Sequence, residues 1–223
     1  MEQQRNIYII GDSTVEDNHP PFRGWGWALP QYVIEDVTVH NHALSGRSSR
    51  SFWAEGLFAP VSQAIKQGDL LLIQFGHNDE KDDDRHTDPA TTFPQYLSQY
   101  CETALNAGAQ PVLLTPVCRR FFVGGGSLLY THGEYALAVR KLAAEKGIPL
   151  CDLKKESRKL YLSLGEEKTA ELFVRLAAGE HPDFPEGHDD KTHFCAYGAE
   201  IIAGLVAEEL KKHPACASFI KER

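Results

Sequence analysis

Long hydrophobic runs and an excess of basic side chains are both missing from this sequence. No stretch approaches the roughly 18 apolar residues that a membrane-spanning helix requires, so we expect no membrane partner. The 223 residues carry a formal net charge of −8, which removes the electrostatic basis for binding nucleic acid or an anionic membrane surface. Hydrophobic residues make up 42% and charged residues 24% of the chain, a balance typical of a packed globular protein.

Cysteine is scarce, and its spacing carries no metal or redox motif. The five cysteines are an odd number and no two have Cys-x-x-Cys spacing, which argues against a disulfide framework. The first predicted strand begins near Asn6, and no hydrophobic leader segment precedes it. These features predict free thiols in a reducing compartment, and we expect a cytoplasmic protein.

Several common glycine motifs are also absent. The chain has no Gly-x-Ser-x-Gly elbow, no Walker loop and no dinucleotide-binding glycine pattern, which excludes the ordinary α/β-hydrolase, nucleotide and nicotinamide classes. No cofactor is therefore expected. There is no internal repeat and no low-complexity segment, so the length favours a single domain over residues 1–223. The sequence contains no signal for a particular oligomeric state.

What the sequence does contain is an alternation of short apolar runs and longer segments of helical periodicity. The apolar runs, each typical of a strand buried on both faces, span residues 7–10, 37–39, 70–75, 112–114 and 148–150. The helix candidates span residues 25–34, 93–107, 133–146, 153–164 and 197–212. This alternation predicts an α/β fold with a five-stranded, parallel, doubly wound sheet.

A serine follows the first predicted strand, in the segment Gly11-Asp12-Ser13-Thr14. In an open parallel sheet, ligands bind at the carboxyl ends of the strands, so a serine on this turn would expose its hydroxyl at the binding edge. That hydroxyl is a weak nucleophile until a neighbouring base takes its proton. Taken alone, such a segment is usually only an ordinary turn.

The base is predicted in the segment Asp190-Lys191-Thr192-His193, just before the last helix candidate. An aspartate three residues ahead of a histidine can accept a hydrogen bond from one ring nitrogen, which leaves the other nitrogen to face Ser13. The same region also offers possible metal ligands in His181, His188 and Asp189, but their spacing matches no standard metal motif. We therefore predict a Ser13, His193 and Asp190 triad and no metal.

Acyl transfer also needs hydrogen-bond donors for the developing oxyanion. The segments after the second and third predicted strands supply two such donors, the backbone N–H of Gly46 and the side-chain amide of Asn78. With the N–H of Ser13 they would surround one point. The predicted oxyanion hole is therefore Ser13, Gly46 and Asn78.

These segments, in this order, resemble the four conserved blocks of the SGNH hydrolases, also called GDSL-type esterases. More narrowly, five segments are similar to the rhamnogalacturonan acetylesterase branch: Gly11-Asp12-Ser13-Thr14-Val15, Gly24-Trp25-Gly26, Asn41-x-Ala43-x-Ser45-Gly46-Arg47-Ser48-Ser49, Gln74-Phe75-Gly76-His77-Asn78-Asp79 and Thr115-Pro116-Val117-x-Arg119-Arg120. The resemblance implies a flavodoxin-like three-layer α/β/α sandwich. It also implies removal of O-acetyl groups from pectin-derived oligosaccharides through an acyl-serine intermediate, without a metal.

Further residues are candidates for holding an acetylated oligosaccharide substrate. Arg47, like Arg119 and Arg120, could bind a sugar carboxylate or form a surface ion pair. Trp53 could stack on a sugar ring or serve as packing, and His77 could touch substrate or brace its loop. Ala54 stands where the branch usually has an aspartate, in a segment (51–56) that would line the substrate groove.

Other functions remain open on the sequence alone. The same triad would serve an esterase for another acetylated glycan, such as xylan. A lipase, thioesterase or lysophospholipase would also use it, but would need a long apolar acyl groove, for which the sequence shows no leucine-rich or aromatic loop. A glycan-binding module that does not consume its ligand is the non-enzymatic alternative.

Overall fold

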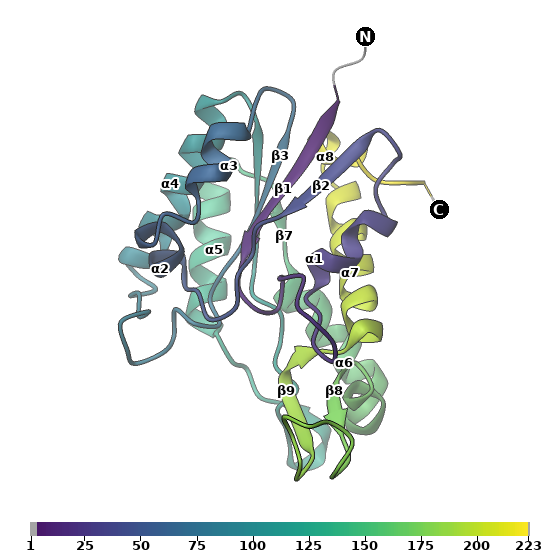
Figure 1. Ribbon diagram of the computed structural model, residues 1–223. Coiled ribbons are helices and arrows are strands. Elements are labelled where there is room, and N and C mark those ends of the chain that lie inside the picture. The colour runs from purple at the N-terminus through teal and green to yellow at the C-terminus, as the bar shows by residue number, and fades with distance from the viewer. Residues whose placement is uncertain (1–3, 223) are drawn as a thin grey trace.

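A central parallel sheet organises the molecule, which we describe from a computed structural model over residues 4–222 (Figure 1). Five strands lie in the order β2-β1-β3-β4-β7, and every neighbouring pair is parallel. Their bounds are β1 Arg5–Gly11, β2 Val37–Asn41, β3 Leu70–Gln74, β4 Gln110–Leu114 and β7 Leu150–Cys151. The predicted five-stranded α/β sandwich is confirmed.

Helices cover both faces of the sheet (Figure 1). One layer holds α1 Trp25–Ala28, the 3-10 turn η1 Leu29–Gln31, α6 Leu153–Ala170, α7 Ala196–Lys211 and α8 Pro214–Ala217. The other holds α2 Ser49–Ala54, α3 Ala59–Ala64, α4 Thr92–Asn106 and α5 Gly133–Lys146. Alternate residues of each strand face opposite layers, so Ile7 and Ile9 enter one core and Tyr8 and Ile10 the other. This explains the near-continuous apolar runs of the strands.

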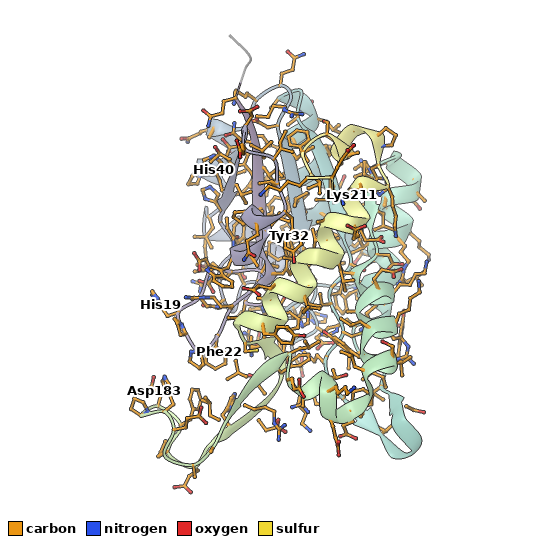
Figure 2. The ribbon with its side chains drawn as sticks, turned by 90° about the vertical axis from the view of Figure 1, so that its right-hand side faces the viewer. His19, Phe22, Tyr32, His40, Asp183 and Lys211 are labelled. Carbon is orange, nitrogen blue, oxygen red and sulfur yellow. The ribbon has the colours of Figure 1, made fainter. Side chains whose placement is uncertain are left out.

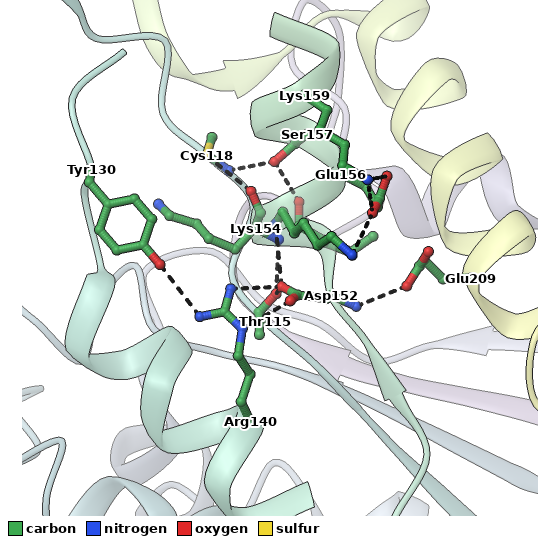
Figure 3. A network of polar contacts seen from close by, with 12 residues as sticks. Thr115, Cys118, Tyr130, Arg140, Asp152, Lys154, Glu156, Ser157, Lys159 and Glu209 are labelled. Atoms are coloured by element: carbon green, nitrogen blue, oxygen red, sulfur yellow. Dashed lines mark hydrogen bonds and ion pairs between the residues drawn. The ribbon is translucent and has the colours of Figure 1, made fainter. Parts of the chain in front are cut away.

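One polar network ties the two helical layers together where β4 and β7 end (Figure 3). Asp152 caps the start of α6 by accepting a hydrogen bond from the N–H of Lys155. Its carboxylate also accepts two hydrogen bonds of 2.9 Å from the Arg140 guanidinium of α5 and one of 3.0 Å from the Thr115 hydroxyl. A capping residue thus anchors both layers to one edge of the sheet.

Two small antiparallel hairpins were not expected from the sequence. The first consists of β5 Phe122–Val123 and β6 Ser127–Leu128, with the glycine turn η2 Gly124–Gly126 at its tip. The second consists of β8 Phe173–Leu176 and β9 His188–Phe194, and it projects past the carboxyl ends of the parallel strands (Figure 1). The segment predicted only as the approach to the last helix is therefore a strand, β9.

An irregularity in β9 determines which way its side chains point. Pairing passes from Phe173–Phe194 directly to Arg175–Asp189, so four residues of β9 bulge opposite one residue of β8. Arg120 holds the bulge, because its N–H donates to the carbonyl of Lys191 at 2.8 Å and its Nη2 to the carbonyl of Asp190 at 3.0 Å. The bulge breaks the strict alternation that would otherwise send residues 190 and 193 to opposite faces.

Two of the helical segments are divided in the structure, and both divisions have a backbone cause. The segment predicted as one helix over 25–34 passes from α1 into η1 at Leu29, with Pro30 inside the 3-10 turn. The helix predicted over 153–164 ends at a kink at Gly165, whose φ of 75° and ψ of 174° are not helical, and a second helical segment carries α6 on to Ala170. No helix within residues 4–222 has the length and apolar character needed to cross a membrane.

Candidate active site

A buried hydrogen-bond chain shapes the turn that follows β1. Oδ1 of Asp12 accepts from the N–H of Thr14 at 3.0 Å and from its hydroxyl at 2.8 Å. Gln74 of β3 donates to the same hydroxyl at 2.7 Å and accepts from the indole N–H of Trp25 at 2.9 Å. Burial raises the pKa of Asp12 to about 6, against the lowering effect of its bonds to Thr14. The turn is rigidly held, with Ser13 at its exposed side.

Ser13 lies at one end of a three-residue hydrogen-bond relay. Its Oγ is 3.0 Å from Nε2 of His193, and Nδ1 of the same ring is 2.8 Å from Oδ2 of Asp190. The other carboxylate oxygen, Oδ1, accepts from the N–H of Thr192 at 2.6 Å and of His193 at 2.8 Å. The structure therefore brings together the three residues predicted as a triad, although Ser13 and His193 are 180 positions apart.

The Asp190 carboxylate is held in its ionised form. Its partial burial taken alone raises the pKa, but the hydrogen bonds from the His193 ring and from the two backbone N–H groups outweigh this. The net pKa of Asp190 lies well below the ordinary value. A permanently ionised carboxylate fixes the proton on Nδ1 of His193 and leaves Nε2 as the acceptor facing Ser13.

The predicted oxyanion donors also lie beside Ser13. Gly46 adopts a left-handed φ of 77°, a conformation that L side chains rarely adopt, and it borders the same cleft as Ser13. Asn78 borders that cleft from the end of β3, and its Nδ2 donates to the carbonyl of Arg47 at 3.0 Å. This bond uses one of the two amide hydrogens and orients the group.

His77 directly precedes Asn78 in the loop after β3, and its side chain is buried. It is 3% exposed, and its ring centroid lies 4.3 Å from that of His132. Nearby, His132 lies 3.1 Å from a carboxylate oxygen of Glu80, and Arg119 donates to the carbonyl of His77 at 3.3 Å and pairs with Glu80. Burial, together with the neighbouring His132 and Arg119, puts the pKa of His77 far below its ordinary value. His77 does not line the cleft, and neither of its ring nitrogens has a hydrogen-bond partner among the described residues, so its ring contacts the loop by packing on His132 alone.

Arg47 and Trp53 are not brought to the cleft as predicted. The Arg47 guanidinium donates to Glu55 at 3.0 and 2.8 Å, so its charge is already paired. Trp53 lies on α2, the helix formed by the segment that was expected to line a groove. Its ring packs on Phe58 and Tyr100, with centroids 5.8 and 5.2 Å away. Helix formation, started by a capping box at Ser48, carries the indole away from Ser13.

The cleft over Ser13 has a volume of about 720 Å³ and two unlike walls. One wall follows Asn78 and contains Lys81 and Arg85. The other contains Phe22 from the loop after β1 and Phe184 from the β8–β9 loop, whose ring centroids are 5.9 Å apart. Figure 2 shows Phe22 and His19 close to Asp183, where these two loops meet.

Neither the charged wall nor the aromatic pair of the other wall was expected from the sequence. The run of charge over residues 81–88 has the composition of a solvated surface loop. Its position directly after the Gly76 to Asp79 strand end was the signal that it borders the site. Phe22 and Phe184 are 162 positions apart, and no local pattern links them.

The group of possible metal ligands near the end of the chain is divided among other partners. Asp189 pairs with Arg120, and Asp190 accepts hydrogen bonds from His193 and His188. Within residues 4–222, no three His, Cys, Asp or Glu side chains are grouped so as to hold a metal ion.

A serine, a histidine and an aspartate in hydrogen-bond sequence at the carboxyl edge of a parallel sheet form the arrangement of a serine hydrolase. The chain belongs to the GDSL-like lipase/acylhydrolase family, whose model matches residues 9–201. It is a carboxylic ester hydrolase, and the predicted resemblance is confirmed.

Two relatives from Bacillus subtilis (strain 168) extend over nearly the whole chain. Rhamnogalacturonan acetylesterase RhgT is 43% identical over 215 residues, covering 95% of this chain and 92% of its own. Probable rhamnogalacturonan acetylesterase YesY is 38% identical over 224 residues, covering 98% and 99%.

Solved structures agree with the fold. The Bacillus subtilis protein YxiM superposes with a TM-score of 0.81 at 29% identity, covering 94% of this chain and 57% of that longer one. Axe2, an acetylxylan esterase from Geobacillus stearothermophilus, superposes with a TM-score of 0.63 at 16% identity, covering 92% and 93%. The second likeness is one of fold alone.

The buried His132 is expected to make stability fall in acid. Burial lowers its pKa from 6.5 to about 4, so between these values the unfolded chain binds a proton that the folded chain does not. The free energy of unfolding therefore decreases as pH falls through this window, by up to about 3 kcal/mol. The substitution His132→Asn removes the group and tolerates the left-handed φ of 54° at this position.

We predict that urea unfolding at pH 7 and pH 4.5 will show a smaller loss of stability for His132→Asn than for the wild type, by about 2 kcal/mol. The raised pKa values of Asp12 and Asp79, both about 6, act in the opposite direction but are common to the two proteins. The exposed His86, replaced by Asn, is the control. Equal pH dependence in the wild type and His132→Asn would contradict the prediction.

Proposed function

We propose that this protein removes O-acetyl groups from pectin-derived, rhamnogalacturonan-type oligosaccharides through an acyl-serine intermediate. The observation that carries the proposal is the relay from Ser13 through His193 to Asp190, with distances of 3.0 and 2.8 Å, beside an open cleft. The names of the relatives that match nearly the whole chain support the choice of acetyl ester and of sugar.

In the first half of the reaction, Oγ of Ser13 attacks the acetyl carbonyl while Nε2 of His193 takes the hydroxyl proton. Asp190 stabilises the imidazolium that forms. The tetrahedral intermediate then collapses: the bond to the sugar oxygen breaks, and His193 returns the proton to that oxygen. The deacetylated sugar leaves, and the acetyl group stays on Ser13.

The second half repeats these proton transfers with water as the nucleophile. His193 takes a proton from water as it attacks the acetyl-serine, and then gives that proton to Oγ of Ser13 as acetate departs. The Ser13–His193 hydrogen bond is restored. The overall reaction consumes one ester bond and one water and yields an alcohol and acetate, with no redox step.

The oxyanion is assigned to the N–H groups of Ser13 and Gly46 and to Nδ2 of Asn78. Asn78 is suited to this role because the Arg47 carbonyl holds one amide hydrogen and leaves the other. Removing one such donor costs about 3 to 4 kcal/mol of transition-state stabilisation in serine hydrolases. The donors sit on three different loops, and Asp79 holds two of these loops together through its bonds to Ser49 and Thr87.

The residues that line the cleft walls favour the binding of a charged sugar over that of a long acyl chain. Phe22 and Phe184 present aromatic rings of the kind that pack on sugar faces. Lys81 places positive charge on the opposite wall, where the carboxylate of a galacturonate would be attracted, whereas Arg85 beside it is paired with Asp83. Lys81 thus takes the role predicted for Arg47, Arg119 and Arg120, whose side chains are paired within the protein.

Replacing the nucleophile tests the chemistry. We expect Ser13→Ala to lower turnover of p-nitrophenyl acetate by about 10⁴-fold or more, because no other group can form the acyl intermediate. The same variant should fail to label with a fluorophosphonate, while its thermal unfolding stays close to that of the wild type. Ser45→Ala, at another serine of the same cleft, is the control and should still label. Retained turnover by Ser13→Ala would refute the assignment.

Replacing a cation of the cleft tests the substrate class. For Lys81→Gln we expect the KM of an acetylated, galacturonate-containing oligosaccharide to rise about threefold to fivefold, the worth of one exposed ion pair. The effect should weaken at high salt, and turnover of p-nitrophenyl acetate should not change. Arg50→Gln, at an exposed arginine outside the cleft, is the control. A neutral acetylated oligosaccharide that responded equally to Lys81→Gln would count against a carboxylate partner.

We also propose that the protein works in the cytoplasm. All five cysteines are free thiols and four of them are buried, which suits a reducing compartment. Immunodetection in fractions of the producing cells is expected to find the protein with cytoplasmic markers. Its presence in the culture medium would contradict this proposal.

A further inference from the structure

Asp190 serves two imidazoles, not one. Nε2 of His188 lies 3.1 Å from Oδ2 of Asp190, the same oxygen that accepts from Nδ1 of His193 at 2.8 Å. Because Oδ1 already accepts two backbone N–H groups, the carboxylate has four hydrogen-bond donors. His188 enters no step of the acyl transfer described above.

The His188 ring is held in place by aromatic contacts. Its centroid lies 4.5 Å from that of Phe184 and 6.0 Å from that of Phe22, and both rings belong to the cleft wall. Phe22 also contacts the His193 ring edge-on, with centroids 5.8 Å apart. Packing therefore keeps both imidazoles in reach of one carboxylate oxygen.

The chemistry of the acceptor fixes the proton on His188. An ionised carboxylate has no hydrogen to donate, so Nε2 of His188 must carry the proton in this contact. The neutral ring can make this bond only in the tautomer that carries its hydrogen on Nε2. The protonated ring always carries that hydrogen. Each donor on Oδ2 draws negative charge from the oxygen that stabilises the His193 imidazolium.

Apart from His193, the charged groups described around His188 make no side-chain hydrogen bond to the Asp190 carboxylate. Arg120 contacts the backbone carbonyl of Asp190, and its guanidinium pairs with Asp189. The remaining ionisable groups along the cleft, none of which has a hydrogen bond to Asp190, are His19, Lys81, Arg85, His181 and Asp183. His188 is thus the one group besides His193 whose side chain bonds the Asp190 carboxylate within residues 4–222.

We propose that His188 is a positioning residue that divides the charge of Asp190 between two imidazoles and so sets the pH below which His193 stops acting as a base. The inference rests on the proposed acyl transfer at Ser13. Without the His188 donor, the full charge of Oδ2 acts on His193, the imidazolium is favoured, and the acidic limb of the rate profile moves to higher pH.

The test is the pH profile of kcat/KM for p-nitrophenyl acetate, a substrate too small to need the sugar-binding walls. His188→Phe keeps an aromatic ring against Phe184 but removes the donor, and His188→Gln keeps an N–H donor near the position of Nε2. We expect the acidic limb of His188→Phe to lie about half a pH unit above that of the wild type, and that of His188→Gln to coincide with the wild type.

His181→Phe is the matched control, because its ring also packs on Phe184, at 5.7 Å, but its Nδ1 accepts from the N–H of Asp183 and has no bond to Asp190. Its acidic limb should match the wild type. Coincident profiles for His188→Phe and the wild type would overturn the proposal. So would equal shifts in His188→Phe and His188→Gln, or in His188→Phe and His181→Phe. Loss of the acyl-transfer mechanism itself is recognised separately, since Ser13→Ala would then retain turnover.

Discussion

The hydrogen bond between Ser13 and His193 is the contact on which the rest of this structure depends. It joins two segments that are 180 positions apart, so each segment must be held in place by further contacts. On one side, a buried chain through Asp12, Thr14 and Gln74 holds the turn after β1. On the other side, a bulged strand held by Arg120 presents the histidine. The N–H of Arg23, in the loop after β1, also donates to the carbonyl of Phe194 in β9 at 2.9 Å, and both segments rely on a rigid sheet beneath them.

That rigidity comes from burial on both faces of the sheet. The central strands have no exposed face, and the two helical layers pack separate sets of their side chains. The polar groups, which are costly to bury in such an apolar core, lie on the loops at the carboxyl edge of the sheet. There, the buried carboxylate of Asp79 and the half-buried carboxylate of Asp152 bind several loops and helix ends at once. The polar groups that shape the cleft therefore depend on the apolar sheet for their positions.

Much of the architecture was predictable because it depends on local periodicity. The five strands, the helix over residues 133–146 and the final helix follow from runs and stripes of apolar side chains. The β8–β9 hairpin was not predictable in the same way, because β9 reads His-Asp-Asp-Lys-Thr-His and contains no apolar alternation before Phe194. It is a strand because β8 pairs with it and because Arg120 satisfies the carbonyls of its bulge. Trp53 shows the converse case: a side chain suited to sugar binding packs instead on Phe58 and Tyr100.

The sequence by itself determined the kind of chemistry. The order of a serine after the first strand, an asparagine after the third and an aspartate three residues ahead of a histidine specifies which groups can meet at the edge of a parallel sheet. Only the tertiary structure decided what surrounds them. The pairing of Phe22 with Phe184, the placement of Lys81 and Arg85 over the cleft and the second imidazole on Asp190 all arise where separate loops converge. Contacts of this kind leave no local pattern, because their geometry is set by the packing of the loops that carry them and not by neighbours in the chain.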